Sequence, residues 1–544
     1  MPFRRPYIKV FSAAVGIALA STVACMRATA TAEGAPVAGI QTAAPPTLLV
    51  FITVDQLRGD MLDRYARDMR YGYARLMRGA WFTRAYHDHA ITETAPGHAT
   101  TLSGRFPRST GIASNAVGVV DRQYPLLVGR PNEAGASPMR FQGTTLFDWL
   151  HAKDARARAL SVSRKDRGAI LPIGRAKQNI YWYSATGAFT TSNYYRDTLP
   201  PWVREFNARR IPHTYAGTRW VLARDSSVYT EPDSVPEENG GRTVFPHQLP
   251  ADTARVTGAL AGVPSSDSLI ALFALEGLTQ LGLGNDSQTD ILAVSFSATD
   301  AVGHAYGPDS REAHDNQIRL DHTLGWFLDS LYRLRDSSRV IVALTADHGV
   351  QPIPALARRR GQAKQNEGLI VSLERQVEFV RDGLAAAGVD SNAFLYDGEL
   401  VGIDRQAIER ARLDADSILN AFRQTALQVP GVARVDRIRD IRRADFALDP
   451  VARRWNHQVP ENSAVELVIT LTPYSYWYNA TATHGSPYDL DAHVPIIFYG
   501  PGFRTGRFTE FARTVDIAPT LAAVLGVTPL QKLDGVVLMN AIQR

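Results

Sequence analysis

Three short, almost uninterrupted apolar runs that lead into acidic or histidine residues constrain the fold of this chain most. They are residues 47–54 (TLLVFITV), 290–296 (DILAVSF) and 339–345 (RVIVALT). A fourth run, 494–499, stops at a Gly-Pro-Gly turn, and 159–162 is a weaker candidate. Continuous β-branched runs of this length are typical of strands buried on both faces, as in a parallel sheet.

Helical periodicity separates these runs. It is found over 267–282, 311–334, 371–387, 406–426 and 516–525. Strands that alternate with helices predict an α/β fold, here a three-layer sandwich with a mostly parallel central sheet.

The chain of 544 residues exceeds one ordinary single-core domain, and two stretches interrupt the alternation. Residues 170–265 (the first insertion) and 355–480 (the second insertion) are predicted to form cap regions over the carboxyl ends of the strands. The core is then assembled from residues 47–169, 266–354 and 481–544.

The N-terminus has the three parts of a secretory signal. Residues 1–32 combine positive charges, an apolar stretch and small residues, with an A-x-A cleavage pattern at 28–30. The apolar stretch is short for a membrane anchor, and lipidation at Cys25 is an alternative to simple cleavage. Residues 33–46 are predicted to be a flexible leader. We therefore expect a periplasmic or secreted protein with no stable membrane insertion.

The charge does not indicate a nucleic-acid partner. Four basic residues precede residue 33, and removing them lowers the net charge from +5 to +1. No basic run with interleaved aromatic residues occurs elsewhere. A single Cys excludes a disulfide framework and a multi-cysteine zinc site, so a metal would need His and carboxylate ligands. A monomer is the expected state.

Candidate metal ligands cluster at the predicted strand ends, where ligands bind in open α/β sheets. The set combines carboxylates and imidazoles, which suit zinc or similar divalent ions. Its members are Asp55, Asp300, His304, Asp347, His348 and His484. Each residue alone has an ordinary structural explanation, but their repetition at one edge favours a metal site. His493, directly before the last strand, is the alternative to His484.

Thr94 is the candidate nucleophile. It precedes Pro96 in a loop that enters a predicted helix, where backbone N–H groups attract anions. Threonine is also a common helix cap with no chemistry. A nucleophilic Thr94 therefore depends on an adjacent metal, which lowers the pKa of a bound oxygen.

Lys165 and Arg167 are candidate ligands for phosphoryl oxygens. They follow the weak strand 159–162, and in an extended chain a spacing of two places both on one face. The alternative is an ordinary solvated charge run.

In this order, the residues resemble the two-zinc set of the alkaline phosphatase superfamily. The resemblance is strongest to its bacterial periplasmic phosphate monoesterases with a Thr nucleophile, which also carry an Asn and a Lys-x-Arg pair. Asn115 and Lys165-Asp166-Arg167 fit those places here. The run Thr94-Ala95-Pro96-Gly97-His98 differs from the formylglycine motif of the sulfatase relatives.

The resemblance implies two Zn²⁺ ions per chain. One would bind Asp300, His304 and His484, and the other Asp55, Asp347 and His348 beside Thr94. Asn115, Lys165 and Arg167 would bind the phosphoryl oxygens of a small-molecule phosphate monoester, hydrolysed through a phospho-threonine. Two alternatives stay open: a nucleotide pyrophosphatase/phosphodiesterase with the same metal set, and a non-catalytic metal or phosphate binder.

Overall fold

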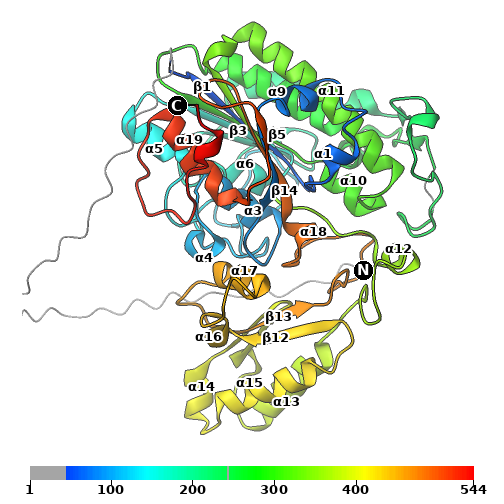
Figure 1. Ribbon diagram of the computed structural model, residues 1–544, viewed down its shortest axis with the longest axis vertical. Helices are drawn as coiled ribbons and strands as arrows, with labels where there is room; N and C mark the ends of the chain where they lie inside the picture. Colours follow the sequence, from blue (N-terminus) through cyan, green and yellow to red (C-terminus); the bar gives the residue numbers. More distant parts are fainter. Residues whose placement is uncertain (1–44, 242–243, 544) are drawn as a thin grey trace, which may run out of the picture. The chain divides into compact units, whose positions relative to one another are not determined.

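The computed structural model describes residues 45–241 and 244–543. In this part of the chain a ten-stranded sheet runs in the order β15-β2-β14-β9-β1-β8-β3-β4-β5, with β16 paired to β2 (Figure 1). Its strands are β1 (Leu48–Val54), β2 (Ala80–Tyr86), β3 (Ala159–Ser163), β4 (Asn179–Tyr183), β5 (Phe189–Thr190), β8 (Asp290–Phe296), β9 (Val340–Thr345), β14 (His493–Tyr499), β15 (Gly506–Phe508) and β16 (Ala512–Arg513).

The middle of this sheet is parallel, because β9, β1, β8, β3 and β4 pair in one direction. Strand β14 is antiparallel to both β9 and β2. All seven residues of β1 are buried, which explains its continuous apolar sequence. Alternate residues of β1 face two different cores: Leu48 and Val50 belong to one, Leu49 and Phe51 to the other.

Helices cover both faces of the sheet, which confirms the predicted three-layer α/β fold. Helices α9 (Ser265–Gln280) and α11 (Arg311–Leu334) pack on the face of Leu48 and Val50. Helices α3 (Thr94–Thr101), α5 (Leu146–Lys153) and α19 (Ile517–Leu525) pack on the opposite face, as Figure 1 shows.

The second insertion contains its own antiparallel sheet, in the order β10-β11-β13-β12. The strands are β10 (Phe394–Asp397), β11 (Leu400–Ile403), β12 (Val432–Arg437) and β13 (Val465–Leu471). One face packs on α13 (Glu374–Ala386) and α15 (Ala415–Ala426), and the other on α16 (Ile438–Ile441) and α17 (Pro450–Gln458). The single helix predicted over 406–426 is two helices, α14 (Arg405–Arg410) and α15, because Arg412 between them has a φ of 58°.

The first insertion is not wholly outside the core. Its strand β4 pairs in parallel with β3, so β4 and β5 extend the central sheet. Sequence analysis missed this because Tyr and Trp in β4 replace the aliphatic residues that mark the other buried strands. The remaining elements of this region are α7 (Pro201–Ala208), β6 (Arg219–Trp220), β7 (His247–Gln248) and α8 (Thr253–Ala259).

Shorter helices connect the core strands. They are α1 (Met61–Arg64), α2 (Gly72–Leu76), α4 (Pro107–Thr110), α6 (Asp166–Ile170), α10 (Ala298–Tyr306), α12 (Pro354–Arg359) and α18 (Asp489–Ala492). Within the described ranges no single helix has both the length and the apolarity of a membrane span; 253–262 and 265–280 meet these criteria only as a pair bent by 94°. The expected signal at 1–32, Cys25 and nearly all of the leader 33–46 lie outside the described residues.

Candidate active site

The candidate ligands lie close together because the strands that precede them are neighbours in the sheet and end at the same level. In the sheet order β9-β1-β8-β3, Thr53 near the end of β1 pairs with Thr345 of β9 and Ser295 of β8. Parallel strands bring their carboxyl ends to one edge. Asp347 and Asp55 follow two of these ends, and α10 carries Asp300 from the third.

A first group of possible metal ligands is formed by Asp55, Asp347 and His348, whose ligand atoms all lie within 4.8 Å of one another. His348 Nε2 is 3.5 Å from Asp55 Oδ1 and 3.7 Å from Asp347 Oδ2. All three side chains are fully buried. Thr94 Oγ1 lies 3.4 Å from His348 Nε2, so the candidate nucleophile adjoins this group.

A second group contains Asp300, His348 and His484, again within 4.8 Å. His348 thus belongs to both groups, and its ring stacks on that of His484 at 3.5 Å. His304 lies beside the second group, with Nε2 3.1 Å from Asp300 Oδ1. His493, the alternative to His484, is directed elsewhere: its Nε2 lies 2.7 Å from the carbonyl oxygen of Thr83.

Backbone carbonyls orient the three imidazoles of the cluster. Nδ1–H of His304 donates to Ala482 O, that of His484 to Thr92 O, and that of His348 to Gly349 O, at 2.8, 2.8 and 2.9 Å. Because a carbonyl only accepts, each Nδ1 carries a proton and each Nε2 is turned toward the carboxylates. This is the arrangement that metal-binding histidines require.

Burial and neighbouring charges shift the pKa values of the cluster in opposite directions. Burial, reinforced by Asp300 and Asp347, raises the pKa of Asp55 well above its ordinary value. Burial also acts on Asp300, but Lys165 and His304 outweigh it and hold the pKa of Asp300 well below its ordinary value. Burial lowers the pKa of both His348 and His484, which keeps these imidazoles neutral.

The donor set fits divalent metal ions. Asp55 Oδ1 and Asp347 Oδ2 are buried and have no hydrogen-bond partner in the described part of the chain. An unsatisfied buried carboxylate oxygen is costly. Cations would satisfy these oxygens, and carboxylates with neutral imidazoles are the ligands that zinc and similar ions take.

Thr94 is the first residue of α3, and all eight residues of this helix are buried. Glu93 is extended and forms the N-cap. Gly97 lies against the backbone of Asp347, where a Cβ would overlap the carbonyl oxygen of Asp347. A glycine is therefore required for α3 to approach the metal-ligand strand so closely.

Lys165 lies at the centre of the site. Its Nζ is 2.7 Å from Asp55 Oδ2, 2.7 Å from Asp300 Oδ2 and 3.2 Å from Thr94 Oγ1. Lys165 is 8% exposed, so the ammonium is held inside the carboxylate cluster rather than in solvent. The alternative of a solvated charge run is therefore wrong for Lys165.

Arg167 and Asn115 occupy different surroundings. The prediction that Lys165 and Arg167 share one face of a strand is wrong, because the chain is extended only up to Lys165 and α6 begins at Asp166. Arg167 pairs with Asp166 at 3.6 Å and its side chain is 28% exposed. Asn115 Oδ1 accepts a hydrogen bond of 2.9 Å from Ala95 N, directly after Thr94.

Two residues that sequence analysis missed orient the carboxylates. Gln56 donates from its backbone N to Asp347 Oδ1 at 3.1 Å and from Nε2 to Asp300 Oδ1 at 3.0 Å. Its φ of 67° is unusual for a residue other than glycine and reflects strain at the site. His98, buried, lies with Nε2 3.4 Å from Asp347 Oδ2. In the sequence, only its position next to Asp55 indicates that Gln56 belongs to the site.

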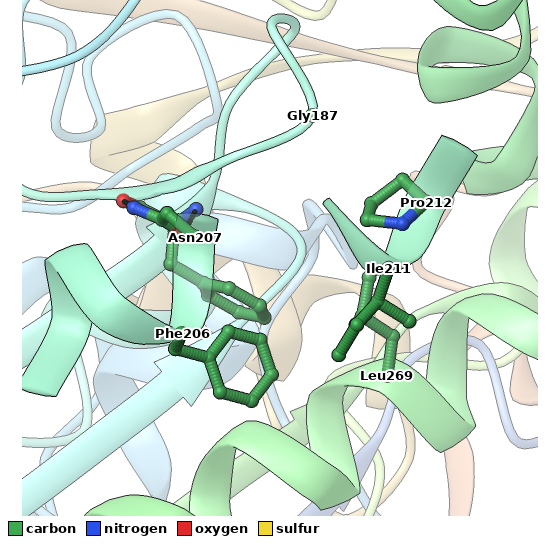
Figure 2. Close-up of a pocket in the computed structure, with 7 residues that line it drawn as sticks. Gly187, Phe206, Asn207, Ile211, Pro212 and Leu269 are labelled. Carbon is green, nitrogen blue, oxygen red and sulfur yellow. Dashed lines mark hydrogen bonds between the residues drawn. The ribbon is translucent and has the colours of Figure 1, made fainter. Parts of the chain in front are cut away.

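A small cavity elsewhere in the fold is not part of this site. It encloses about 10 Å³ and is lined by residues that include Phe206, Ile211 and Leu269 (Figure 2). None of the candidate ligands lines it. A space of this size holds at most a single water, so it has no room for a phosphate ester.

The chain matches the family described as "Type I phosphodiesterase / nucleotide pyrophosphatase" over residues 49–421. It is 30% identical over 517 residues to the alkaline phosphatase PhoV of Synechococcus elongatus, covering 90% of this chain and 91% of PhoV. It is 29% identical over 535 residues to the alkaline phosphatase PhoK of a Sphingomonas species, covering 91% of each.

A solved structure supports the same relationship. The crystal structure of wild-type alkaline phosphatase PafA superimposes with a TM-score of 0.83 at 26% sequence identity, covering 92% of this chain and 100% of PafA. PafA of Elizabethkingia meningoseptica is also 28% identical in sequence over 509 residues, covering 89% of this chain and 92% of PafA. The likeness therefore extends through the insertions as well as the core.

Proposed function

The chain belongs to the type I phosphodiesterase / nucleotide pyrophosphatase family, and we propose that within it the protein is an alkaline phosphatase. It hydrolyses small-molecule phosphate monoesters to an alcohol and inorganic phosphate through a phospho-threonine at Thr94. PhoV and PhoK, which match over nine-tenths of the chain, carry the name alkaline phosphatase. The observation that carries the proposal is the ammonium of Lys165, 3.2 Å from Thr94 Oγ1 between two groups of possible metal ligands.

A monoester differs from a diester by one additional negative charge on phosphorus. A cation beside the nucleophile favours the substrate with more charge, since a buried ion pair is screened less than one in water. Lys165 supplies that cation, and Asn115 and Arg167 are proposed to bind the other non-bridging oxygens. Recognition by positioned charges is the main source of catalysis in phosphoryl transfer.

We propose two zinc ions as the cofactors. Asp55, Asp347 and His348 would hold one, and Asp300, His304 and His484 the other, with His348 close enough to contribute to either. Such a pair, when bound, lowers the pKa of the attacking hydroxyl and stabilises charge on the leaving oxygen. Gln56 and His98 keep the carboxylates oriented toward the site.

The chain's own residues then define two steps. Thr94 Oγ1 attacks phosphorus in line with the ester oxygen, forming a Thr94–phosphorus bond as the bond to the alcohol breaks. Water next hydrolyses phospho-Thr94, which releases inorganic phosphate and restores the hydroxyl. Lys165, Asn115 and Arg167 hold the phosphoryl oxygens through both steps. Covalent catalysis of this kind divides one difficult displacement into two easier ones.

A nucleotide phosphodiesterase is the second candidate, because the matching family carries that activity in its description. It would use the same metal ligands and Thr94. The buried position of Lys165 favours the monoesterase, since a diester carries one negative charge fewer for that ammonium to neutralise.

The deciding experiment compares an aryl phosphate with its methyl diester. In the wild-type protein kcat/KM should be far higher for the monoester. Lys165→Met should lower monoester kcat/KM by about 10²-fold or more, the scale of one lost electrostatic contact at a reaction centre, and diester kcat/KM much less. Lys177→Met is the matched control, because Lys177 contacts the ring of Tyr194 instead. Equal losses on the two substrates for Lys165→Met would contradict the monoesterase.

We also propose that the protein is exported and acts as a periplasmic or secreted monomer. The N-terminal pattern at residues 1–32 supports cleavage of a signal. The intact mass of the mature protein tests signal cleavage directly. Cleavage near residue 30 gives an unmodified chain, whereas cleavage before Cys25 with added acyl mass, lost in Cys25→Ser, would indicate a lipoprotein instead.

A further inference from the structure

Helix α17 of the second insertion contacts residues 88–93, which lead into Thr94 and are called the nucleophile segment below. Arg453 Nε donates to Asp88 Oδ1 at 3.0 Å, and His457 Nδ1 donates to Asp88 O at 2.7 Å. Asp88 is 2% exposed, so this contact is well shielded from solvent. Ala90 and Ile91 pack into the same small core as the buried apolar residues of α17. The nucleophile segment is therefore as much a part of the insertion's core as of the central sheet.

The side chain of Gln458, the last residue of α17, bridges two segments of the active site. Its Oε1 accepts from Ile91 N at 2.9 Å, and its Nε2 donates to Ala113 O at 2.6 Å. Gln458 is 0% exposed. Ile91 precedes Thr94 by three residues, and Ala113 precedes Asn115 by two. One buried amide thus holds the nucleophile segment and the Asn115 loop together.

The same two segments are joined again beside the reaction centre. Asn115 N donates to Glu93 Oε2 at 2.6 Å, and Ala95 N donates to Asn115 Oδ1 at 2.9 Å. Gln458 therefore fixes one end of a short ladder of hydrogen bonds whose other end lies at Thr94. If the Gln458 contact is lost, the Asn115 loop can shift relative to Thr94.

We infer that Gln458 is a positioning residue for catalysis: it aligns the Asn115 loop with Thr94 from outside the catalytic core. The inference rests on the proposed function, in which Thr94 attacks and Asn115 binds a phosphoryl oxygen. An amide donates through its nitrogen and accepts through its oxygen at once, and the backbone N–H of buried Ile91 would otherwise lack a partner. A misplacement near 1 Å is enough to lower a rate by about 10²-fold.

The test uses Gln458→Met, which keeps the length of the side chain and removes both hydrogen bonds. We expect kcat/KM to fall by roughly 10–100-fold, by the same factor for an aryl phosphate and its methyl diester, because Thr94 and Asn115 serve both substrates. Lys165→Met, in contrast, is expected to discriminate between them. In an Asn115→Ala background the further loss from Gln458→Met should be much smaller, since coupled residues are not additive.

Thr470→Val is the matched control. It removes the acceptor of a buried 2.8 Å hydrogen bond from Trp455 Nε1, a side chain of the same helix, and leaves both hydrogen bonds of Gln458 in place. We expect a lower Tm and an unchanged kcat/KM. If Thr470→Val lowers kcat/KM as much as Gln458→Met does, or if the losses from Gln458→Met and Asn115→Ala multiply in full, the positioning role is refuted.

Amide hydrogen exchange separates this inference from the proposed function. Gln458→Met should speed exchange in peptides covering 88–95 and 110–117, and Thr470→Val should leave these peptides unchanged. Faster exchange in a protein without phosphatase activity would refute the proposed function and retain the bridge. Unchanged exchange together with unchanged kcat/KM in Gln458→Met would refute the inference while the phosphatase assignment stands.

Discussion

The two sheets of this protein contribute to the site in different ways. In the central sheet, β9, β1, β8 and β3 are parallel neighbours, so chain segments far apart in sequence release their next residues at one edge. The sheet of the second insertion is antiparallel, and its strand ends alternate between two edges. None of the candidate ligands comes from that sheet.

The central sheet therefore supplies the candidate catalytic side chains, and the second insertion helps to align them. Parallel strands concentrate polar residues at one edge, where they form a site. The antiparallel sheet instead supports α17, which contacts the nucleophile segment through Asp88 and Ile91. Catalytic activity should therefore tolerate almost no change at the strand ends of the core, whereas in the insertion it should be sensitive mainly on the α17 surface that touches the core.

Loss of the nucleophile in the core should have the largest effect. Thr94→Ala should abolish the trapped phosphoenzyme and reduce turnover on the order of 10⁶-fold, as removal of an attacking side chain does in another hydrolase. Peptide mapping after an acid quench with a radiolabelled monoester measures the phosphoenzyme. Thr94→Ser, which keeps a hydroxyl, should retain the label on residue 94. A label elsewhere in the wild-type protein would contradict the assignment.

A pair of glycine substitutions compares the two regions directly. Gly97→Ala in α3 places a Cβ against Asp347 O, so the helix must shift and kcat/KM should fall about 10²-fold. Gly383→Ala in α13 of the insertion meets nothing within 4 Å and should raise stability by about 0.5–1 kcal/mol with kcat/KM unchanged. Steady-state kinetics and thermal unfolding measure both. Equal effects of the two substitutions would remove the contrast between the regions.

The pH dependence of stability gives a smaller effect at the base of α10. Asp267 Oδ1 accepts from Ser297 N and Ala298 N, and burial raises the pKa of Asp267 to about 7. The folded state therefore holds this proton more tightly than the unfolded state, where the pKa is about 4. The stability from this group is full below about pH 4 and is lost as pH rises through about 7.

Asp267→Asn keeps the accepting oxygen and cannot ionise. Its Tm should therefore rise relative to the wild-type Tm between pH 4 and pH 8. Asp225 is the control: this exposed cap in the first insertion accepts from Ser227, which lowers its pKa, so its titration lies below about pH 4 and Asp225→Asn should give a Tm difference that hardly varies between pH 4 and pH 8. A Tm difference for Asp267→Asn that does not vary with pH would contradict the assignment.

The central strands and their ligands were predictable because their signal is local. Residues 290–296 are an almost uninterrupted apolar run, and Asp300 and His304 follow it, spaced from each other by one helical turn. The choice of His484 over His493 agrees with the structure for a reason that only the fold reveals: β14 places the His493 imidazole against Thr83 O.

Other features had no such signal. Strand β2 carries a charged residue and is antiparallel to β14, and β4 is aromatic. The break at Arg412 divides a helix whose apolar periodicity continues across it. Gln458 makes contacts more than three hundred residues distant in sequence, so nothing in its local sequence marks it. Contacts of this range depend on how the insertion packs on the core.

The account depends most on whether the strand ends of the central sheet bind a pair of metal ions beside Thr94. Anomalous diffraction at the zinc absorption edge, from crystals of the full-length enzyme, tests this directly. We predict two peaks, one among Asp55, Asp347 and His348 and one among Asp300, His304 and His484. Crystals of active enzyme with no peak at these residues, or with zinc bound only elsewhere, would contradict the account.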